Sequence, residues 1–185
     1  YVLAIEALAE ADASVAVTCA VCNLACGIVE DYGSDEVKEA YLKPFLTKNQ
    51  GQAASFCLSE PQAGTDAGAL RCSAVREGDS FVLNGSKQWI TNGAHAAFHV
   101  VFAKTEAGVT GFLVPGDADG INVGPAEKKM GLKGSNTVAL HFENCRIPVS
   151  HLLGEDGRGY AVALSALGKG RIGIAAQSLG LGEAA

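Results

Sequence analysis

The strongest structural signal in this sequence is the segment Phe56-Cys57-Leu58-Ser59-Glu60-Pro61-Gln62-Ala63-Gly64-Thr65-Asp66. It overlaps the apolar run 53–58, which has the length and composition of a buried strand, and Pro61 then imposes a rigid turn. Backbone N–H groups in such a turn, with the hydroxyls of Ser59 and Thr65, suit the pyrimidine edge of a flavin or an anionic phosphate. An ordinary Pro/Gly turn fits the same pattern, so the segment alone leaves both interpretations open.

A second motif, Lys87-Gln88-Trp89-Ile90-Thr91-Asn92-Gly93, contains the only tryptophan of the chain. In a strand, Trp89 and Thr91 would point to the same face, which would place an aromatic plane beside a hydroxyl. Such a face could cover a flat ring and hydrogen-bond to a ring nitrogen. A lone tryptophan that fills the core is the alternative interpretation.

The sequence before the first motif predicts helices. Residues from Tyr1 to about Gly27 are rich in Ala, Val and Leu and predict a largely buried helix with a break near residues 11–14. Ser34 is expected to cap a second helix, because acidic residues follow it in what would be the first turn. Pro44 is expected to bend or stop this helix.

Between residues 51 and 148 the pattern is that of strands. Asn84-Gly85 lies between strand-like flanks and predicts a hairpin turn. Further strands are expected at 98–104, 110–115 and 137–143, Pro148 marks a boundary, and helical sequence resumes at Gly159. Helices, then strands, then a helix predict an α+β protein, with a small antiparallel β-barrel or sandwich domain flanked by helices.

Composition and charge narrow the function classes. Hydrophobic residues make up 48% of the chain and charged residues 18%, which allows a sizeable core. A net charge of −6 without a basic run argues against nucleic acid as a partner. No continuous apolar run is long enough to predict a membrane span. The chain starts and stops within helical sequence, so a fragment of a longer protein is expected.

Six cysteines are present, and Cys19, Cys22 and Cys26 have a spacing that occurs in metal and Fe–S sites. Their neighbours are apolar and no acidic or histidine ligand lies nearby, so packing as small apolar residues is the favoured interpretation. No metal site and no disulfide are expected, which fits a reducing compartment.

Taken together, the two motifs resemble the acyl-CoA dehydrogenase family, and the resemblance covers nearly the whole chain. The further blocks that carry it are Gly33-Ser34-Asp35-Glu36, Met130-Gly131-Leu132-Lys133-Gly134-Ser135-Asn136-Thr137, Phe142-Glu143-Asn144-Cys145-Arg146-Ile147-Pro148, Leu153-Gly154-Glu155 and Gly170-Arg171-Ile172-Gly173-Ile174-Ala175. The last block is most similar to short-chain or butyryl-type members. The resemblance implies that residues 1–52 end an N-terminal helical domain, 53–149 form a middle β domain and 150–185 start a C-terminal helical domain.

The resemblance also implies FAD as the cofactor and assigns residues to it. Ser59 would bond the pyrimidine edge, Trp89 would flank the ring, and the Thr91 hydroxyl would bond flavin N5. Thr65 would lie near the pyrophosphate and the CoA moiety. The implied flavin-binding set is Phe56, Cys57, Leu58, Ser59, Gly64, Thr65, Trp89, Ile90 and Thr91, and the implied substrate-binding set is Thr65, Gly168, Lys169, Gly170 and Arg171.

The implied reaction is the α,β-dehydrogenation of an acyl-CoA thioester, in which a glutamate removes the α-proton and flavin N5 receives the β-hydride. In most of the family that glutamate lies beyond the position of residue 185. In a minority it directly precedes the arginine that matches Arg171, where this chain has Gly170. The chain by itself is therefore expected to lack the catalytic base and to be inactive, and Glu60 is interpreted as structural.

One residue of the implied substrate site departs from the family pattern, and two short motifs match other kinds of site. The family often has an aspartate where this chain has Gly168, which weakens any adenine contact there, and Lys169 is favoured as a solvated residue. The run 168–173 fits the dinucleotide fingerprint G-x-G-x-x-G, but helical sequence rather than a strand precedes it. His95 and His99 have the spacing of a zinc-peptidase helix without the glutamate that such a site requires.

Alternatives within the same scaffold are an acyl-CoA oxidase or a flavin monooxygenase, and from another class a non-catalytic β module that contacts partners. The resemblance further implies electron-transferring flavoprotein as the electron acceptor and a homotetramer in which a neighbouring subunit completes the FAD site. It also implies a place in fatty acid β-oxidation, in the mitochondrial matrix or the bacterial cytoplasm.

Overall fold

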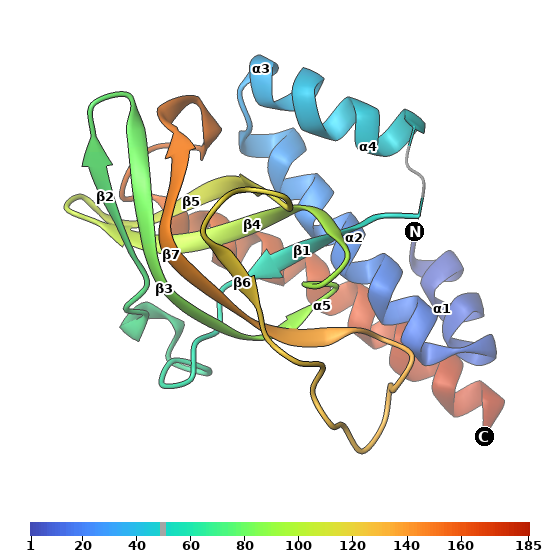
Figure 1. The fold of residues 1–185 in the computed structure, drawn as a ribbon. Coiled ribbons are helices and arrows are strands. Elements are labelled where there is room, and N and C mark those ends of the chain that lie inside the picture. The colour runs from blue at the N-terminus through green and yellow to red at the C-terminus, as the bar shows by residue number, and fades with distance from the viewer. Residues whose placement is uncertain (49–50) are drawn as a thin grey trace.

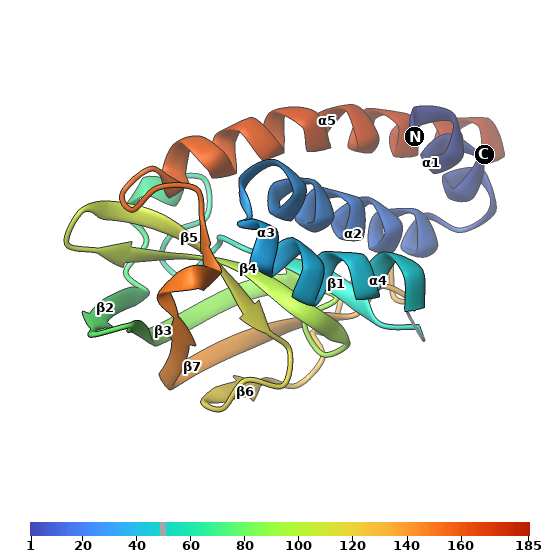
Figure 2. The ribbon, with the colours of Figure 1, turned by 90° about the horizontal axis from the view of Figure 1, so that it is seen from above.

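The computed structural model describes residues 1–48 and 51–185 and consists of a helical layer packed on a curled β-sheet (Figure 1). Seen from above, the long C-terminal helix and the first helices lie together on one side of the strands (Figure 2). The α+β class predicted from the order of elements is confirmed, with helices at both ends of the chain and the strands between them.

The first helical stretch is broken at Asp12, as predicted. α1 (Val2–Ala11) and α2 (Ala13–Tyr32) meet there, because the Asp12 carboxylate accepts hydrogen bonds from Ser14 N at 2.7 Å and Val15 N at 3.4 Å and caps α2. α2 continues past the expected end near residue 27 and stops only before Gly33.

The second helix begins as predicted but does not end as predicted. The Ser34 hydroxyl accepts a hydrogen bond from Val37 N at 3.3 Å, which confirms the cap of α3 (Asp35–Val37). Of the two effects expected of Pro44, a bend or a stop, the stop is wrong, since α4 (Lys43–Lys48) continues through it. A π-helical turn (Lys38–Leu42) lies directly before Pro44, and its wider backbone accommodates a residue that lacks an N–H group.

Within the described residues the strands form one eight-stranded sheet with the order β6-β7-β3-β2-β4-β5-β8, and β1 joins it by pairing with β4. Most neighbours are antiparallel, but β1 runs parallel to β4, and so does β2 where it meets β4. The sheet is therefore mixed, because β1 enters it from the helical layer and not from a hairpin. The strands are β1 (Ala53–Cys57), β2 (Ser73–Glu77), β3 (Ser80–Thr91), β4 (Ala96–Thr105), β5 (Gly108–Pro115), β6 (Ile121–Val123), β7 (Thr137–Pro148) and β8 (Leu152–Leu153).

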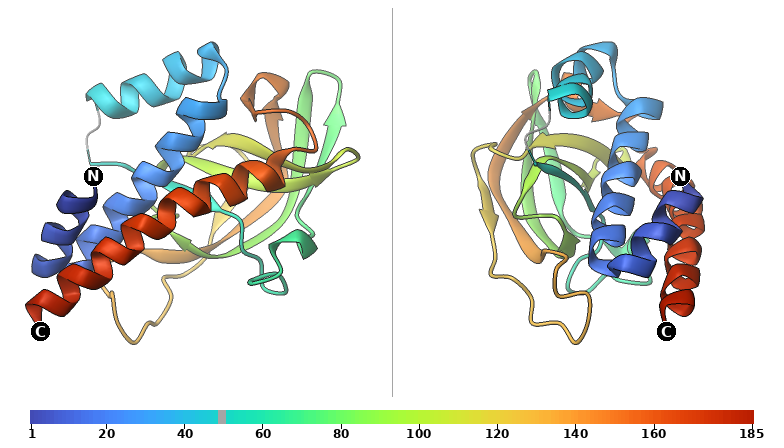
Figure 3. Two further views of the ribbon diagram at one scale, coloured as in Figure 1. Left: turned by 180° about the vertical axis from the view of Figure 1, so that it is seen from behind. Right: turned by 90° about the vertical axis from the view of Figure 1, so that its right-hand side faces the viewer.

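The helices cover one side of the curled sheet (Figure 3). Apolar side chains fill both sides of the sheet. One cluster lies inside the curl and includes Phe112 and Phe142. The other joins the opposite side of the sheet to the helices through residues such as Ile28 and Phe102. Each such side chain contributes about 1.5–3 kcal/mol on burial, so both clusters stabilise the arrangement of sheet and helices.

The long helix α5 (Gly159–Ala184) is continuous although it contains several glycines. A side chain at Gly180 would collide with the backbone carbonyl of Glu6, so this glycine permits the close crossing of α1 and α5. Among the described helices, α2 alone is long and apolar enough by composition to cross a membrane. It packs on β1 and α5.

The predicted hairpin at Asn84-Gly85 is wrong, because β3 runs straight through both residues. The tight turn lies earlier, at Gly78-Asp79 between β2 and β3. Asn84 and Gly85 instead sit where the register between β3 and β7 shifts. Gly85 has a φ of +141°, and a Cβ atom there would lie 2.7 Å from Cys72 Cα, so the glycine allows β3 to approach the start of β2.

A buried side-chain hydrogen bond fixes β1 to β4 in addition to the strand ladder. Ser55 Oγ and His99 Nδ1 are 2.6 Å apart, and both residues are almost fully buried. Burial lowers the pKa of His99 from 6.5 to about 4, so the imidazole is neutral at pH 7. The pair thus satisfies two polar groups in the core without burying a charge.

The depressed pKa of His99 predicts a loss of stability in mild acid. The contribution of His99 to the free energy of unfolding is complete above pH 6.5, its pKa in the unfolded chain. This contribution declines as the pH falls toward 4, because the unfolded chain then binds a proton that the folded chain excludes. Between pH 7 and pH 4.5 the wild-type protein should lose about 2–3 kcal/mol more than the His99→Gln variant. Urea titrations at the two pH values measure this difference. The exposed His95→Gln variant is the control, and equal losses in wild type and His99→Gln would contradict the prediction.

Candidate functional site

The two motifs singled out in the sequence lie side by side in the structure. The turn after β1 is closed by reciprocal backbone hydrogen bonds between Glu60 and Ala63, at 2.9 and 3.0 Å. Directly before this turn, Ser59 O accepts a hydrogen bond from Gln88 N of β3 at 2.9 Å. The first motif therefore contacts the second motif at Gln88, the residue before Trp89.

A buried ion pair reinforces this contact. Lys87 Nζ lies 2.7 Å from Glu60 Oε1 and donates a second hydrogen bond to Leu58 O at 3.1 Å. The side chains of Lys87 and Glu60 are 0% and 3% exposed, so the pair is shielded from water. Glu60 also accepts hydrogen bonds from the backbone N–H groups of Arg71 and Cys72, at 2.6 and 3.0 Å.

These contacts decide the chemical character of Glu60. Burial by itself raises the pKa of a carboxyl group, but the hydrogen bond from Lys87 and those from the two backbone N–H groups outweigh it, and the pKa of Glu60 is lowered from 4.5. A carboxylate held ionised by several donors is a poor proton acceptor. The structural interpretation of Glu60 agrees with this geometry.

Trp89 does not fill the core. Its side chain is 61% exposed, and its φ of +61° lies in the left-handed region that residues other than glycine rarely adopt. The strained residue falls where the register between β3 and β7 shifts, between Lys87 and Ile90. The indole is exposed at this bulge, and Thr91, two residues further on, is partly exposed. Such local strain is typical of binding and active sites.

The remaining flavin-binding candidates divide by accessibility. Phe56 and Ser59 are partly exposed, and Gly64 and Thr65 lie at the surface. Three candidates are buried in the core and expose almost no surface to a ligand. Those three are Cys57, Leu58 and Ile90. Burial also raises the pKa of Cys57 to about 12, which makes its thiol unreactive.

Asn92 is a structural residue that the sequence did not reveal. It is 2% exposed, has a φ of +66°, and its side-chain amide donates to Ala54 O at 3.1 Å and Thr18 O at 3.2 Å. It therefore joins the end of β3 to both β1 and α2. The residue lies in the second motif, but nothing in its sequence position indicated which carbonyl groups it would meet.

The substrate-binding candidates on α5 lie apart from these motifs. Residues 168–171 are in the middle of the helix, and it is the first turn of α5, at Tyr160, that approaches the loop after Thr65. Gly168 and Arg171 are exposed. The run 168–173 lies inside a continuous helix, so it has neither the strand nor the turn of a dinucleotide-binding site.

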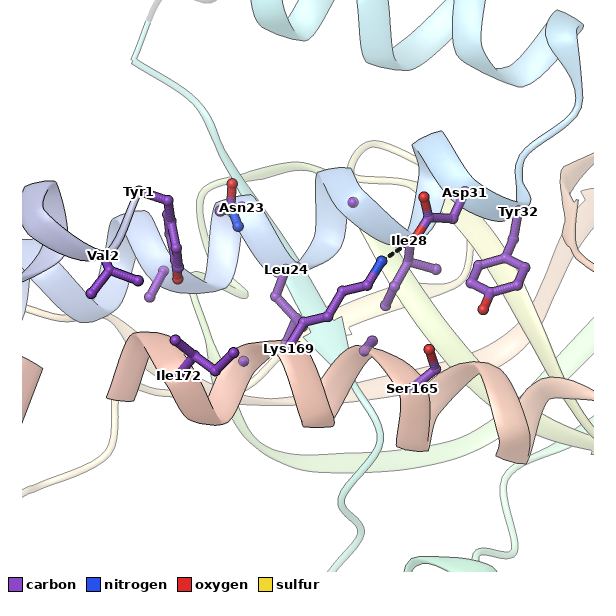
Figure 4. A pocket seen from close by; sticks show the side chains of 14 residues that line it. Tyr1, Val2, Asn23, Leu24, Ile28, Asp31, Tyr32, Ser165, Lys169 and Ile172 are labelled. Carbon is purple, nitrogen blue, oxygen red and sulfur yellow. Dashed lines mark hydrogen bonds and ion pairs between the residues drawn. The ribbon is translucent and has the colours of Figure 1, made fainter. Parts of the chain in front are cut away.

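Lys169 has a partner that the sequence did not predict. Its Nζ lies 2.6 Å from Asp31 Oδ2 of α2, although 69% of the lysine side chain remains exposed. This ion pair borders a groove of about 350 Å³ between α2 and α5 (Figure 4). Apolar side chains such as Leu24 and Ile172 line most of the groove.

No group of three or more His, Cys, Asp or Glu side chains in residues 1–48 and 51–185 is placed to hold a metal ion. Of the three cysteines with metal-like spacing, Cys22 is engaged in packing contacts with β1: its Sγ lies 3.4 Å from Ala54 N. Burial raises the pKa of Cys26 to about 12, which disfavours the thiolate that a metal requires.

Comparisons with known proteins agree with this fold and site. A family model of the acyl-CoA dehydrogenase N-terminal domain matches residues 1–49, and a model of the acyl-CoA dehydrogenase middle domain matches residues 55–145. The human mitochondrial short-chain specific acyl-CoA dehydrogenase is 44% identical over 191 residues, which cover 100% of this chain and 46% of that protein.

Solved structures give the same result. Butyryl-CoA dehydrogenase from Megasphaera elsdenii superposes with a TM-score of 0.94 at 39% identity, covering 100% of this chain and 49% of that chain. A Mycobacterium smegmatis glutaryl-CoA dehydrogenase in complex with FADH2 superposes with a TM-score of 0.90 at 34% identity, covering 97% and 46%. The helical layer on a mixed sheet is therefore the fold that these dehydrogenases share. The chain belongs to the acyl-CoA dehydrogenase family, and it spans about half the length of the relatives it matches.

The role of Asn92 predicts a large effect of a small substitution. Asn92→Ala removes the amide that joins three elements and leaves the carbonyl groups of Ala54 and Thr18 without their donor. We expect the free energy of unfolding to fall by about 2 kcal/mol more than in Asn144→Ala. Asn144 is the matched control, since it has a similar φ of +51° but an exposed side chain. Similar losses in both variants would show that backbone strain alone explains the effect.

Proposed function

We propose that the protein carrying this chain is an FAD-dependent acyl-CoA dehydrogenase that oxidises short-chain acyl-CoA thioesters to trans-2-enoyl-CoA. The observation that carries the proposal is the exposed, strained Trp89 placed directly beside the Ser59 turn. Membership of the family and the names of the human and Megasphaera elsdenii relatives support the short-chain substrate class.

The residues at this site fit a flavin. An isoalloxazine ring needs an apolar plane on one side and hydrogen-bond partners along its polar edge, and the indole of Trp89 with the hydroxyls of Ser59 and Thr91 supplies both kinds of group. A Cβ atom at Gly64 would meet no atom within 4 Å, so the surface beside the turn is open to a ligand. Thr65 follows it with a further exposed hydroxyl, which we assign to the phosphate and CoA side.

Bound FAD would supply the hydride acceptor that the reaction requires. The chain's own groups would bind and orient: Ser59 holds the pyrimidine edge, Trp89 covers the ring and excludes water, and the Thr91 hydroxyl donates to the nitrogen that takes the hydride. Gly168, Lys169, Gly170 and Arg171 are retained as substrate-side candidates on α5. The proton acceptor is assigned to the part of the protein outside this chain, because Gly170 occupies the alternative position.

The proposal extends to partners and setting. We assign electron-transferring flavoprotein as the electron acceptor and a homotetramer as the assembly, in line with the family. The human relative is described as mitochondrial and the Megasphaera elsdenii relative is bacterial, which supports either the mitochondrial matrix or the bacterial cytoplasm. The domain boundaries at residues 52 and 149 belong to the same proposal.

The proposal predicts a coloured protein that its substrate bleaches. The full-length protein is purified without added flavin, its visible spectrum is recorded, and it is titrated anaerobically with butyryl-CoA and with longer acyl-CoAs. We expect a yellow protein whose flavin band disappears most readily with butyryl-CoA. Bleached flavin that oxygen, and not electron-transferring flavoprotein, reoxidises rapidly would favour an oxidase on the same scaffold, and bound FAD that no acyl-CoA bleaches would favour a monooxygenase. A protein that cannot take up FAD would refute the enzyme function and favour a partner-binding module.

A single hydroxyl should separate binding from hydride transfer. Thr91→Val keeps the shape of the side chain and removes its donor, so FAD should stay bound while the rate of bleaching by butyryl-CoA falls about tenfold or more. Stopped-flow absorbance measures the rate, and Thr47→Val on the distant helix α4 is the control. An unchanged rate would remove Thr91 from the proposed site.

A further inference from the structure

Glu60 lies in the first motif of the proposed flavin site and Lys87 lies in the second motif. Glu60 follows Ser59 directly, and Lys87 precedes Trp89 by two residues. The motifs are far apart in sequence, and their contact is made through this ion pair and its backbone neighbours. The pair is therefore the side-chain link between the turn and the strand that together present the candidate flavin contacts.

The link is more than a single ion pair. Lys87 Nζ holds both Glu60 Oε1 and Leu58 O, at 2.7 and 3.1 Å, so the lysine contacts the chain on both sides of Ser59. Gln88 N donates to the carbonyl of Ser59 itself at 2.9 Å. Residues 58–60, which lead into the turn, are thus held by Lys87 and Gln88 of β3.

Glu60 extends the link to the far end of the loop. Its carboxylate accepts from Arg71 N at 2.6 Å and Cys72 N at 3.0 Å, where the chain approaches β2, and from Gln62 Nε2 at 2.6 Å within the turn. The loop between residues 60 and 71 is therefore closed by one side chain, and the loop contains Gly64 and Thr65. Every hydrogen bond to this carboxylate is directional, which fixes the orientation of the loop as well as its position.

Stability alone does not explain such a pair. Removing two charges from water costs free energy, and replacing a buried ion pair with apolar residues of similar volume is often neutral or stabilising. The apolar cluster inside the sheet could have been continued through these positions. An arrangement that satisfies all its polar groups but stabilises little is better explained by the geometry it imposes.

We propose that Glu60 and Lys87 are positioning residues for the flavin: the buried pair would hold Ser59 in register with Trp89 and Thr91, without adding net charge next to these candidate flavin contacts. The inference rests on the proposed FAD site. Neither side chain is accessible to a ligand, so both act through the residues that they hold in place.

A paired substitution separates positioning from stability. Glu60→Gln/Lys87→Met removes both charges together, so it leaves no unpaired buried charge and should fold with an unfolding midpoint close to that of the wild type. The full-length protein is stripped of flavin, and its affinity for FAD is measured by fluorescence titration below that midpoint. We expect the affinity to fall about tenfold or more, as it does when residues that orient other binding groups are lost, and the visible flavin band to change shape.

The matched control is Glu77→Gln/Arg146→Met, which removes the ion pair between β2 and β7 whose side chains are 54% and 55% exposed. This variant should bind FAD like the wild type. If the paired Glu60/Lys87 variant does not fold, Glu60→Asp is measured instead, because it keeps both charges and shortens the side chain that holds the loop. The same loss of affinity is expected.

The outcomes distinguish the two levels of inference. Suppose that the wild-type protein binds FAD and that the Glu60/Lys87 variant has the same FAD affinity and the same flavin spectrum. This result would overturn the positioning role and leave the proposed function intact. A loss of FAD affinity that is fully explained by a lower unfolding midpoint of the variant would overturn the positioning role as well. A wild-type protein that binds no FAD would instead refute the proposed function, and with it the inference that depends on it.

Discussion

The parallel pairing of β1 with β4 is the constraint on which both layers depend. β1 is short, but its residues bond to three different elements: Ala54 O accepts from the amide of Asn92 at the end of β3, Ala54 N lies against a thiol of α2, and Ser55 bonds to His99 of β4. A shift of β1 by one residue would break all of these bonds and would turn its buried side chains to the opposite face. Because the Ser59 turn follows β1 directly, the same pairing determines where the hydroxyl and N–H groups of the turn lie.

Local sequence signals predicted the elements better than their pairing. The cap at Ser34 and the break at Asp12 were recognised because each depends on one side chain and the N–H groups two or three residues further on. Asn84-Gly85 was misassigned because the same dipeptide serves a tight turn and a bulge in a long strand, and only the neighbouring strands decide between them. The parallel direction of β1 was missed for a similar reason, since no local pattern records which strand a segment will meet.

The candidate site shows the same division. Both motifs were recognised from the residue types they contain, and the resemblance to a family indicated that they act together. What the sequence could not show is the contact itself: that Lys87 reaches Glu60, that Trp89 adopts a left-handed backbone, or that Lys169 pairs with Asp31. Each of these depends on residues brought together by the sheet or by helix packing. Burial also divides the candidates, because residues such as Cys57 lie wholly in the core whereas Trp89 is exposed.

Glu60 shows why a carboxylate that orders a loop is a poor proton acceptor. Glu60 directly follows Ser59, yet four donors occupy its oxygens, and the hydrogen bonds from Lys87, Arg71 N and Cys72 N lower its pKa. A general base that takes a proton from carbon works best when its pKa is raised toward the working pH, which needs burial without such partners. The contacts that make Glu60 suitable for holding a loop therefore make it unsuitable as a base.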